Sequence, residues 1–180
     1  MLIRPWRAGD ERLVEAVQRH LSARSIDRRF LAGSGGRLPA FYLCHIAAGP
    51  RPEWDAEVAL DGGQLCGWAE YGRRPADAPE ADLAVLVADP WQRTGLATTL
   101  IRALVPRMAA AGVRTVQADV SGTNAATKGL VRALAGPNHA AIHEDGLLRY
   151  TFDLRSEGHP VDEARVEVAA LLEHVRHAIA

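Results

Sequence analysis

The segment Gln92 to Ala97, QRTGLA, places a glycine at the expected start of a helix. Glycine costs about 1 kcal/mol relative to alanine inside a helix, so its use at this point favours a need for accessible backbone. The first N–H groups of a helix have no acceptor within the helix, and with the helix dipole they bind anions. Gly95 is therefore the first candidate for chemistry in this chain, as part of an anion-binding turn.

The elements around Gly95 are expected to be a strand, a turn and a helix. The run Asp82 to Ala88 is short and apolar and ends at Asp89-Pro90, which is typical of a largely buried strand. The helix after it repeats apolar residues at every fourth position and ends at Gly112. Its apolar row consists of Leu96, Leu100, Leu104 and Met108. This unit brings the first amides of the helix to the end of the strand.

The rest of the chain alternates between helical and strand patterns. A strand at 2–6 precedes helical segments at 13–21 and 26–31, the second of them capped by Ser25. Strands at 57–60 and 64–71 flank Asp61-Gly62-Gly63, a strong hairpin signal. A strand at 113–120, a helix at 124–135 and a hairpin at 140–154 complete the pattern. The order predicts a mixed α/β domain built around one sheet.

The composition fits a folded globular domain, with 48% hydrophobic and 24% charged residues among 180. A net charge of −1 lacks the basic excess of a nucleic-acid-binding protein. The N-terminus has no apolar signal-peptide region, and no apolar run reaches about 18 residues. We therefore expect a cytoplasmic protein that binds neither nucleic acid nor membrane. Cys44 and Cys66 are expected to be buried thiols.

The strand, turn and QRTGLA helix start resemble the Q/R-x-x-G-x-G/A motif of the GNAT superfamily of acyl-CoA-dependent N-acyltransferases. The resemblance covers residues 2–155 and implies a single α/β (α+β) domain with a central mixed, mostly antiparallel sheet of about seven strands flanked by helices. It also implies acetyl-CoA as co-substrate, with the pyrophosphate bound by the turn. The turn residues are Gln92, Arg93, Thr94, Gly95, Leu96, Ala97 and Thr98.

Two further groups of residues follow from the same resemblance. The main chain of Val85, Leu86 and Val87 would bind the pantetheine arm of the coenzyme like an added strand. Asn124, at the start of the next helix, matches an asparagine that many family members place near the phosphate end of the coenzyme. Asn124 also fits a simple helix N-cap, and the two interpretations are compatible.

Bacterial protein-lysine acetyltransferases show a closer resemblance, in Ser22-Ala23-Arg24-Ser25 with Arg29-Phe30 and in AVLVADPWQ. In such enzymes a glutamate in the strand is the general base, and the matching residue here is Asp82. Aspartate is one methylene shorter, so it would act directly or through a water. Glu80 would share its strand face and is the alternative base. The family's tyrosine acid is replaced by Val131, which leaves Tyr150 or Tyr71 as candidates.

The resemblance implies an enzyme that moves an acetyl group directly from acetyl-CoA to a primary amine, on a small molecule or a protein lysine. No histidine pair has convincing metal-ligand spacing, and we expect no metal. The shorter acid and the absent tyrosine leave open a catalytically degenerate acyl-CoA-binding sensor or regulatory module. Residues 1–156 would form the enzyme domain. Residues 157–180 have an amphipathic helical pattern and would pack on that domain or on a partner subunit in a homodimer.

Overall fold

The computed structural model describes residues 1–31, 35–135, 139–144 and 146–154. The strands are β1 (Leu2–Pro5), β2 (Trp54–Asp61), β3 (Gln64–Gly72), β4 (Glu80–Val87), β5 (Thr115–Ser121), β6 (His139–Glu144) and β7 (Leu147–Asp153). The helices are α1 (Glu11–Val17), α2 (Ala23–Phe30), α3 (Ala40–Ala47), α4 (Leu96–Ala110) and α5 (Ala125–Ala135). Short 3₁₀ turns follow α1 at Gln18–His20 and β4 at Asp89–Trp91. The C-terminal helix and the boundary at residues 157–180 expected from the sequence lie outside the described residues.

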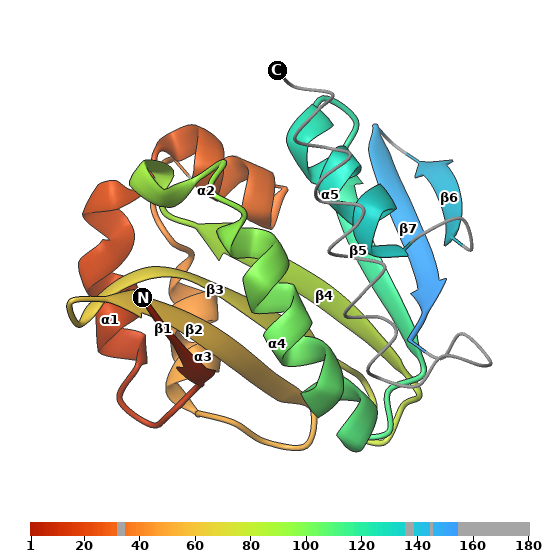
Figure 1. Ribbon diagram of the computed structural model, residues 1–180, viewed down its shortest axis with the longest axis horizontal. Coiled ribbons are helices and arrows are strands. Elements are labelled where there is room, and N and C mark those ends of the chain that lie inside the picture. Colours follow the sequence, from red (N-terminus) through yellow and green to blue (C-terminus); the bar gives the residue numbers. More distant parts are fainter. Residues whose placement is uncertain (32–34, 136–138, 145, 155–180) are drawn as a thin grey trace.

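The seven strands form one sheet in the order β1-β2-β3-β4-β5-β7-β6. Every neighbouring pair is antiparallel except β4 and β5, which are parallel. Short connections join β2 to β3, β3 to β4 and β6 to β7. The helix α4 provides the crossover between the two parallel strands (Figure 1). The prediction of a mixed, mostly antiparallel sheet of about seven strands is confirmed.

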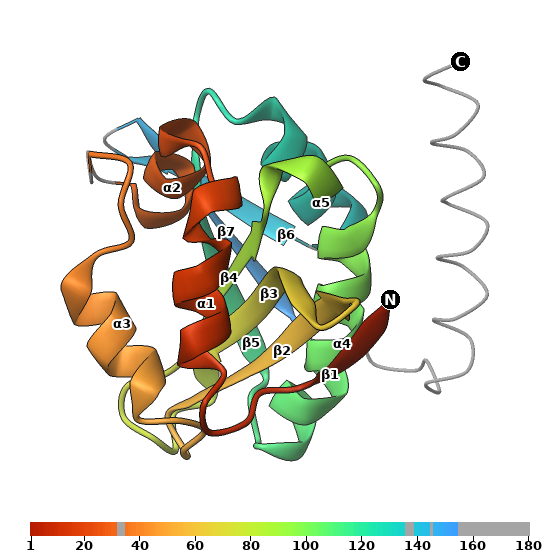
Figure 2. The ribbon, with the colours of Figure 1, turned by 90° about the vertical axis from the view of Figure 1, so that its left-hand side faces the viewer.

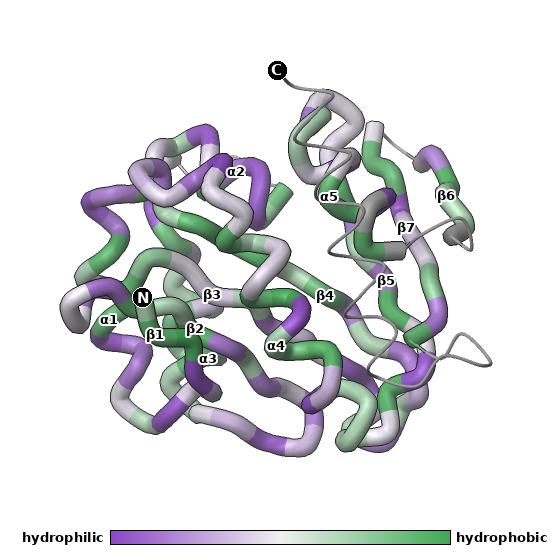
Figure 3. Tube along the Cα trace, viewed as in Figure 1, coloured by the Kyte–Doolittle hydropathy of each residue, from purple (hydrophilic) through white to green (hydrophobic). Residues whose placement is uncertain are grey.

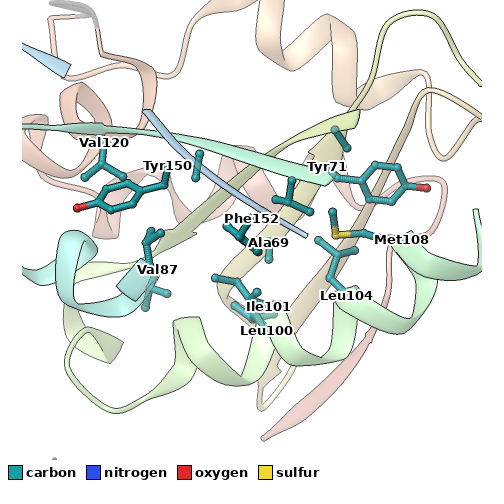
Figure 4. Packing of buried hydrophobic residues seen from close by; sticks show 14 of the residues in the cluster. Ala69, Tyr71, Val87, Leu100, Ile101, Leu104, Met108, Val120, Tyr150 and Phe152 are labelled. Atoms are coloured by element: carbon teal, nitrogen blue, oxygen red, sulfur yellow. The ribbon is translucent and has the colours of Figure 1, made fainter. Parts of the chain in front are cut away.

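Helices cover both faces of the sheet. Figure 2 shows α1, α2 and α3 on one face and α4 and α5 on the other. The first face packs around the buried residues Val14, Ile26, Ile46, Val58 and Trp68. The second face forms the larger core in Figure 4, where Leu100, Ile101, Leu104 and Met108 of α4 lie against sheet residues such as Ala69 and Phe152. The apolar row read from the sequence is therefore the buried side of α4, and burying each such side chain contributes about 1.5–3 kcal/mol.

Two local predictions are wrong, and one helix was missed. The helix α3 was not predicted. The second helical segment is α2, which begins at Ala23, and its cap is Ser22, whose hydroxyl accepts the N–H of Ser25 at 3.2 Å. Cys66 is buried as expected, but Cys44 is exposed. Among the described helices, none is both long and apolar enough to cross a membrane.

Hydropathy follows this architecture. In Figure 3, β4 is coloured mostly hydrophobic, whereas α2 carries several strongly hydrophilic residues. The apolar side of α2 still contacts the core, since Ile26 is fully buried there and Phe30 packs against the same core. The polar contacts that hold α2 in place are part of the candidate site described next.

Candidate active site

The strands β4 and β5 pair only at their N-terminal ends. Three residue pairs join them: Glu80 with Thr115, Ala81 with Val116, and Asp82 with Gln117. Beyond Asp82 the two strands separate, and Figure 1 shows them converging at the lower right and diverging from there. Within the described part of the chain, the edge of β4 facing β5 is therefore not paired with any strand from Leu83 to Val87. Asp82 is the last paired residue before the strands part.

The turn between β4 and α4 exposes a row of backbone donors. Arg93 and Gly95 both have left-handed backbone conformations, with φ of 62° and 84°. The first amide of this region that donates inside the helix is that of Thr99, to the Gly95 carbonyl at 3.1 Å. Across the described residues, the N–H groups from Arg93 to Thr98 have no acceptor. Successive free amides at a helix N-terminus bind an anion such as a phosphate, so the turn has the free backbone donors that such a site requires.

Side chains fix the conformation of this turn. The Thr94 hydroxyl donates to the Trp91 carbonyl at 2.7 Å. The Gln92 amide nitrogen donates to the Val87 carbonyl and to the Asp89 carboxylate, both at 3.0 Å. These bonds tie the turn to the end of β4. The side chains of Thr94 and Gln92 thus hold the turn in shape, and the free donors of the turn are backbone groups.

A group of hydrogen bonds also holds α2 against the turn. The Asp89 carboxylate accepts the Ser25 hydroxyl at 2.6 Å and the Ser22 amide at 3.2 Å. Gln92 donates to the same Ser25 hydroxyl at 3.0 Å. Burial acts to raise the pKa of Asp89, but the hydrogen bonds from Ser25 and Ser22 outweigh it and hold that pKa below its usual value. The serines quoted from the sequence are therefore the cap and the anchor of α2.

A cavity of about 590 Å³ connects these features. Its walls come from α2, β4, the turn, α4, β5, α5 and β7. The predicted site residues that line it are Asp82, Val85, Leu86, Val87, Gln92, Arg93, Gly95, Leu96, Ala97 and Asn124. Thr94, Thr98, Glu80 and Tyr150 are not among its lining residues. Ten residues predicted from separate parts of the sequence thus converge on one cavity.

The two candidate bases occupy different positions. Glu80 is exposed and accepts the Gln117 side-chain amide at 3.3 Å. It lines a second cavity, also about 590 Å³, with the basic residues Arg51, Arg73 and Arg74. Asp82 lines both cavities. Of the two carboxylates, only Asp82 adjoins both the cavity with the free amides and the second cavity.

The surroundings of Asp82 suit a proton acceptor. Alternation along the strands places Asp82 and Asp119 on the sheet face opposite the core residues Ala81 and Ala118. Although Asp82 keeps solvent access, the protein around it reduces its hydration, and this desolvation is the main cause that raises its pKa. The Asp119 carboxylate raises that pKa further, whereas Arg149, paired with Asp119 at 2.8 Å, opposes the rise.

The tyrosine candidates lie in the core. Tyr150 is 1% exposed and pairs across the sheet with Ala118, and Figure 4 shows it beside Val120 within the core under α4 and α5. Tyr71 is 3% exposed, next to Met108 in the same figure, and burial raises its pKa. Both side chains belong to the core on the face opposite Asp82. Among the described residues, no tyrosine lines the first cavity.

Asn124 has the helix-capping role that the sequence allowed. Its side-chain oxygen accepts the N–H of Thr127 at 3.2 Å, which is an N-cap interaction for α5. The residue is 7% exposed and also lines the cavity. Both interpretations of Asn124 are compatible with this position.

A buried ionic network behind the cavity was not predicted. The Glu70 carboxylate on β3 receives an ion pair from Arg29 of α2, the Tyr42 hydroxyl at 3.0 Å and the Trp54 indole N–H at 2.9 Å. Trp68 in turn donates to the Tyr42 oxygen at 2.7 Å. Arg29 also lines the cavity. The Arg29-Phe30 pair quoted from the sequence is the only signal that pointed to this network.

The residues present fit acetyl-CoA as a co-substrate. The free amides from Arg93 to Thr98 suit the pyrophosphate, and Gly95 leaves the space beside them open, because a Cβ built there would meet no heavy atom within 4 Å. The unpaired edge of β4 offers main-chain donors and acceptors for amides in an extended arm. Among the described residues, no group of three His, Cys, Asp or Glu side chains is placed to hold a metal ion.

Comparisons with known proteins agree with this description. Residues 21–136 match the model of the acetyltransferase (GNAT) family, and the chain belongs to that family. The GNAT domain of S. lividans PAT is 25% identical, with a TM-score of 0.70 over 84% of this chain and 89% of that one. A search of curated proteins found no match.

Two more distant structures share the fold. YncA, a putative acetyltransferase from Salmonella typhimurium solved with its cofactor acetyl-CoA, is 18% identical over 89% of this chain and 98% of that one, with a TM-score of 0.64. A cAMP-binding acyltransferase from Mycobacterium smegmatis is 21% identical over 93% of this chain and 49% of that one, with a TM-score of 0.59.

Proposed function

We propose that the protein is an N-acetyltransferase that moves an acetyl group from acetyl-CoA to a primary amine, with Asp82 as general base. One observation carries this proposal: the carboxylate at the point where β4 and β5 separate lines the same cavity as the free amides of the turn. A phosphate-binding turn alone would fit any binder of a nucleotide-like molecule. The carboxylate in the same cavity adds a group that can take a proton.

Starting from an ammonium group, the reaction removes two protons from the nitrogen and exchanges one bond. Acetyl-CoA supplies a thioester, whose carbonyl carbon gains a bond to the amine nitrogen as its bond to sulfur breaks. Asp82 takes the first proton, directly or through a water, so that the neutral amine can attack, and returns it to solvent. The second proton leaves the nitrogen once the C–N bond has formed, to the departing thiolate or to solvent. The N–H groups on the open edge of β4 between Leu83 and Val87 can donate to the carbonyl oxygen. The turn amides hold the phosphates and so orient the thioester.

The charges around Asp82 favour a cationic acceptor. The carboxylates of Asp119 and Glu80 both act on Asp82 and raise its pKa, against the opposing charge of Arg149. A lysine side chain is cationic in water and would be attracted by these groups before it loses its proton. A protein lysine is therefore the acceptor class that we propose, with small amines of similar charge as the alternative.

A steady-state assay of free thiol release tests this function. Acetyl-CoA would be incubated with the full chain and a panel of lysine-containing peptides and small amines. We expect amine-dependent thiol release that Asp82→Asn reduces strongly. Tight acetyl-CoA binding without turnover of any amine would instead support a regulatory acyl-CoA-binding module, the alternative favoured by the absence of a tyrosine among the described lining residues.

A further inference from the structure

The first cavity has two chemically different ends. On the face of α1 to α3 it is polar, with Arg28, Asp82, Asp119 and Arg149 in its wall. On the face of α4 and α5 its wall has the polar residues Asn124 and Thr127 at the start of α5, together with six hydrophobic residues that belong to or pack against the core. These are Ile101, Leu130, Val131, Leu134, Ala118 and Phe152. The cavity therefore passes between β4 and β5 and continues into the hydrophobic core.

The apolar end extends past the position of Asp82. Phe152 pairs with Val116 of β5, and Val116 pairs with Ala81 of β4. Phe152 is thus in register with Ala81, which lies one residue nearer the start of β4 than Asp82. Leu134 lies near the C-terminal end of α5, far from the turn amides that begin the cavity. Space lined by apolar side chains therefore continues beyond the residue proposed to take the amine proton.

A polar group would be poorly accommodated at this end. None of its six side chains has a hydrogen-bond donor or acceptor, and burying an unpaired amide costs about 1–3 kcal/mol. The amides of an extended coenzyme arm have partners elsewhere, on the open edge of β4 from Leu83 to Val87. The occupant of the apolar end must itself be apolar and continuous with the reacting thioester.

We infer that this cavity accepts acyl donors with an aliphatic chain longer than acetyl, of the propionyl and butyryl class, and that Val131 sets the available depth. This inference rests on the proposed function. Val131 is 6% exposed and lies in the cavity wall, where its short side chain leaves room that a larger residue would fill. The bond exchange is unchanged: the C–N bond forms, the C–S bond breaks, and Asp82 takes the amine proton.

Binding measurements test the inference without knowledge of the acceptor. Calorimetry would compare coenzyme A, acetyl-CoA, propionyl-CoA and butyryl-CoA on the full chain. Each buried methylene should tighten binding about fourfold, the equivalent of about 0.8 kcal/mol. Val131→Phe should remove this gain, so that acetyl-CoA, propionyl-CoA and butyryl-CoA bind the variant with the same affinity. Val105→Phe is the matched control, because Val105 is partly buried against the same core but does not line the cavity.

The outcomes separate the inference from the proposed function. If wild-type protein binds butyryl-CoA no more tightly than acetyl-CoA, the long-chain assignment is wrong although the coenzyme site stands. If a folded Val131→Phe variant keeps the gain per methylene, the apolar end is not where the chain lies. Should the wild-type chain bind neither coenzyme A nor any acyl-CoA, the proposed function itself fails. Should Val131→Phe not fold, the wild-type series still decides the chain-length preference.

Discussion

Gly95 and Gly112 flank α4 in nearly the same left-handed backbone conformation, with φ of 84° and 87°. A Cβ added at either position would meet no heavy atom within 4 Å. The two glycines thus share a backbone requirement and differ in location, since only Gly95 lies in the cavity wall. This pair allows the strain of a substitution to be separated from its effect on binding.

We expect Gly95→Glu to abolish measurable coenzyme A binding, because the side chain places bulk and negative charge beside the free amides. Left-handed strain should cost both Gly95→Glu and Gly112→Glu about 1–2 kcal/mol of unfolding free energy. Calorimetry and thermal unfolding of both variants would check this. Equal coenzyme A affinity in the two folded variants would contradict the assignment of the turn as the phosphate-binding site.

Replacement of the proposed base should affect rate and leave binding intact. Asp82→Asn is expected to lower kcat by roughly 10²–10⁴-fold, the usual contribution of general acid–base catalysis. Coenzyme A affinity should hardly change, because Asp82 lies at the opposite end of the open β4 edge from the turn. Glu80→Gln is the control, since Glu80 does not line the cavity with the free amides. If Glu80→Gln instead lowers the rate and Asp82→Asn does not, the base is Glu80.

The pH dependence should follow the charges around Asp82. The base is active when deprotonated, so kcat/KM should rise as pH passes upward through the pKa of Asp82, which burial and Asp119 raise. Asp119→Asn removes a negative charge and should move this rise to lower pH. Arg149→Gln removes the opposing positive charge and should move it to higher pH. Shifts in the same direction for both variants would contradict the assignment of Asp82.

The high-pH side of the profile tests the absence of a tyrosine acid. An ordinary thiol, with a pKa of about 8.5, leaves as its anion near neutral pH without a proton donor. We therefore expect no falling limb near pH 9–10, and Tyr150→Phe should leave the profile unchanged. A falling limb that disappears in Tyr150→Phe would identify Tyr150 as the acid.

The network around Glu70 should contribute stability. Glu70→Gln leaves the Arg29 guanidinium without a carboxylate partner in a site where the Glu70 side chain is only 5% exposed. Breaking a buried ion pair in this way costs about 3–5 kcal/mol. Glu53→Gln removes a more exposed carboxylate, whose contact with Arg51 should contribute at most about 1 kcal/mol. Urea denaturation of both variants would show whether the difference exists.

The sequence predicted the parts of the site that depend on short-range pattern. The strand ending at Asp89-Pro90 and the glycine at the helix start lie within 14 residues, and local backbone chemistry determines both. The network of Glu70 could not be read in this way, because its partners lie 16, 28 and 41 residues away. A glutamate within a strand is also as compatible with a solvated face as with a buried one.

Two other features depended on tertiary context. The helix α3 has the sequence AFYLCHIA, almost entirely apolar, so it lacks the contrast between faces that makes helical periodicity visible. Tyr150 remained a candidate acid because the alternation along a strand defines two faces but does not show which of them packs into the core. The pairing of β7 with β5 shows which face Tyr150 is on, because it places Tyr150 opposite the core residue Ala118.

The three residue pairs between β4 and β5 are the shortest pairing between neighbouring strands, and they join two units of the sheet, strands β1 to β4 and strands β5 to β7. Within each unit the strands are paired over longer stretches, from four residue pairs between β1 and β2 to eight between β2 and β3. Because the cavity wall includes residues of both units, a ligand bound there would contact both and could form hydrogen bonds across the gap. Binding stabilises the native state by mass action. Amide hydrogen exchange should therefore slow on both sides of the gap when coenzyme A is added. The co-substrate would then hold the two units of the sheet together.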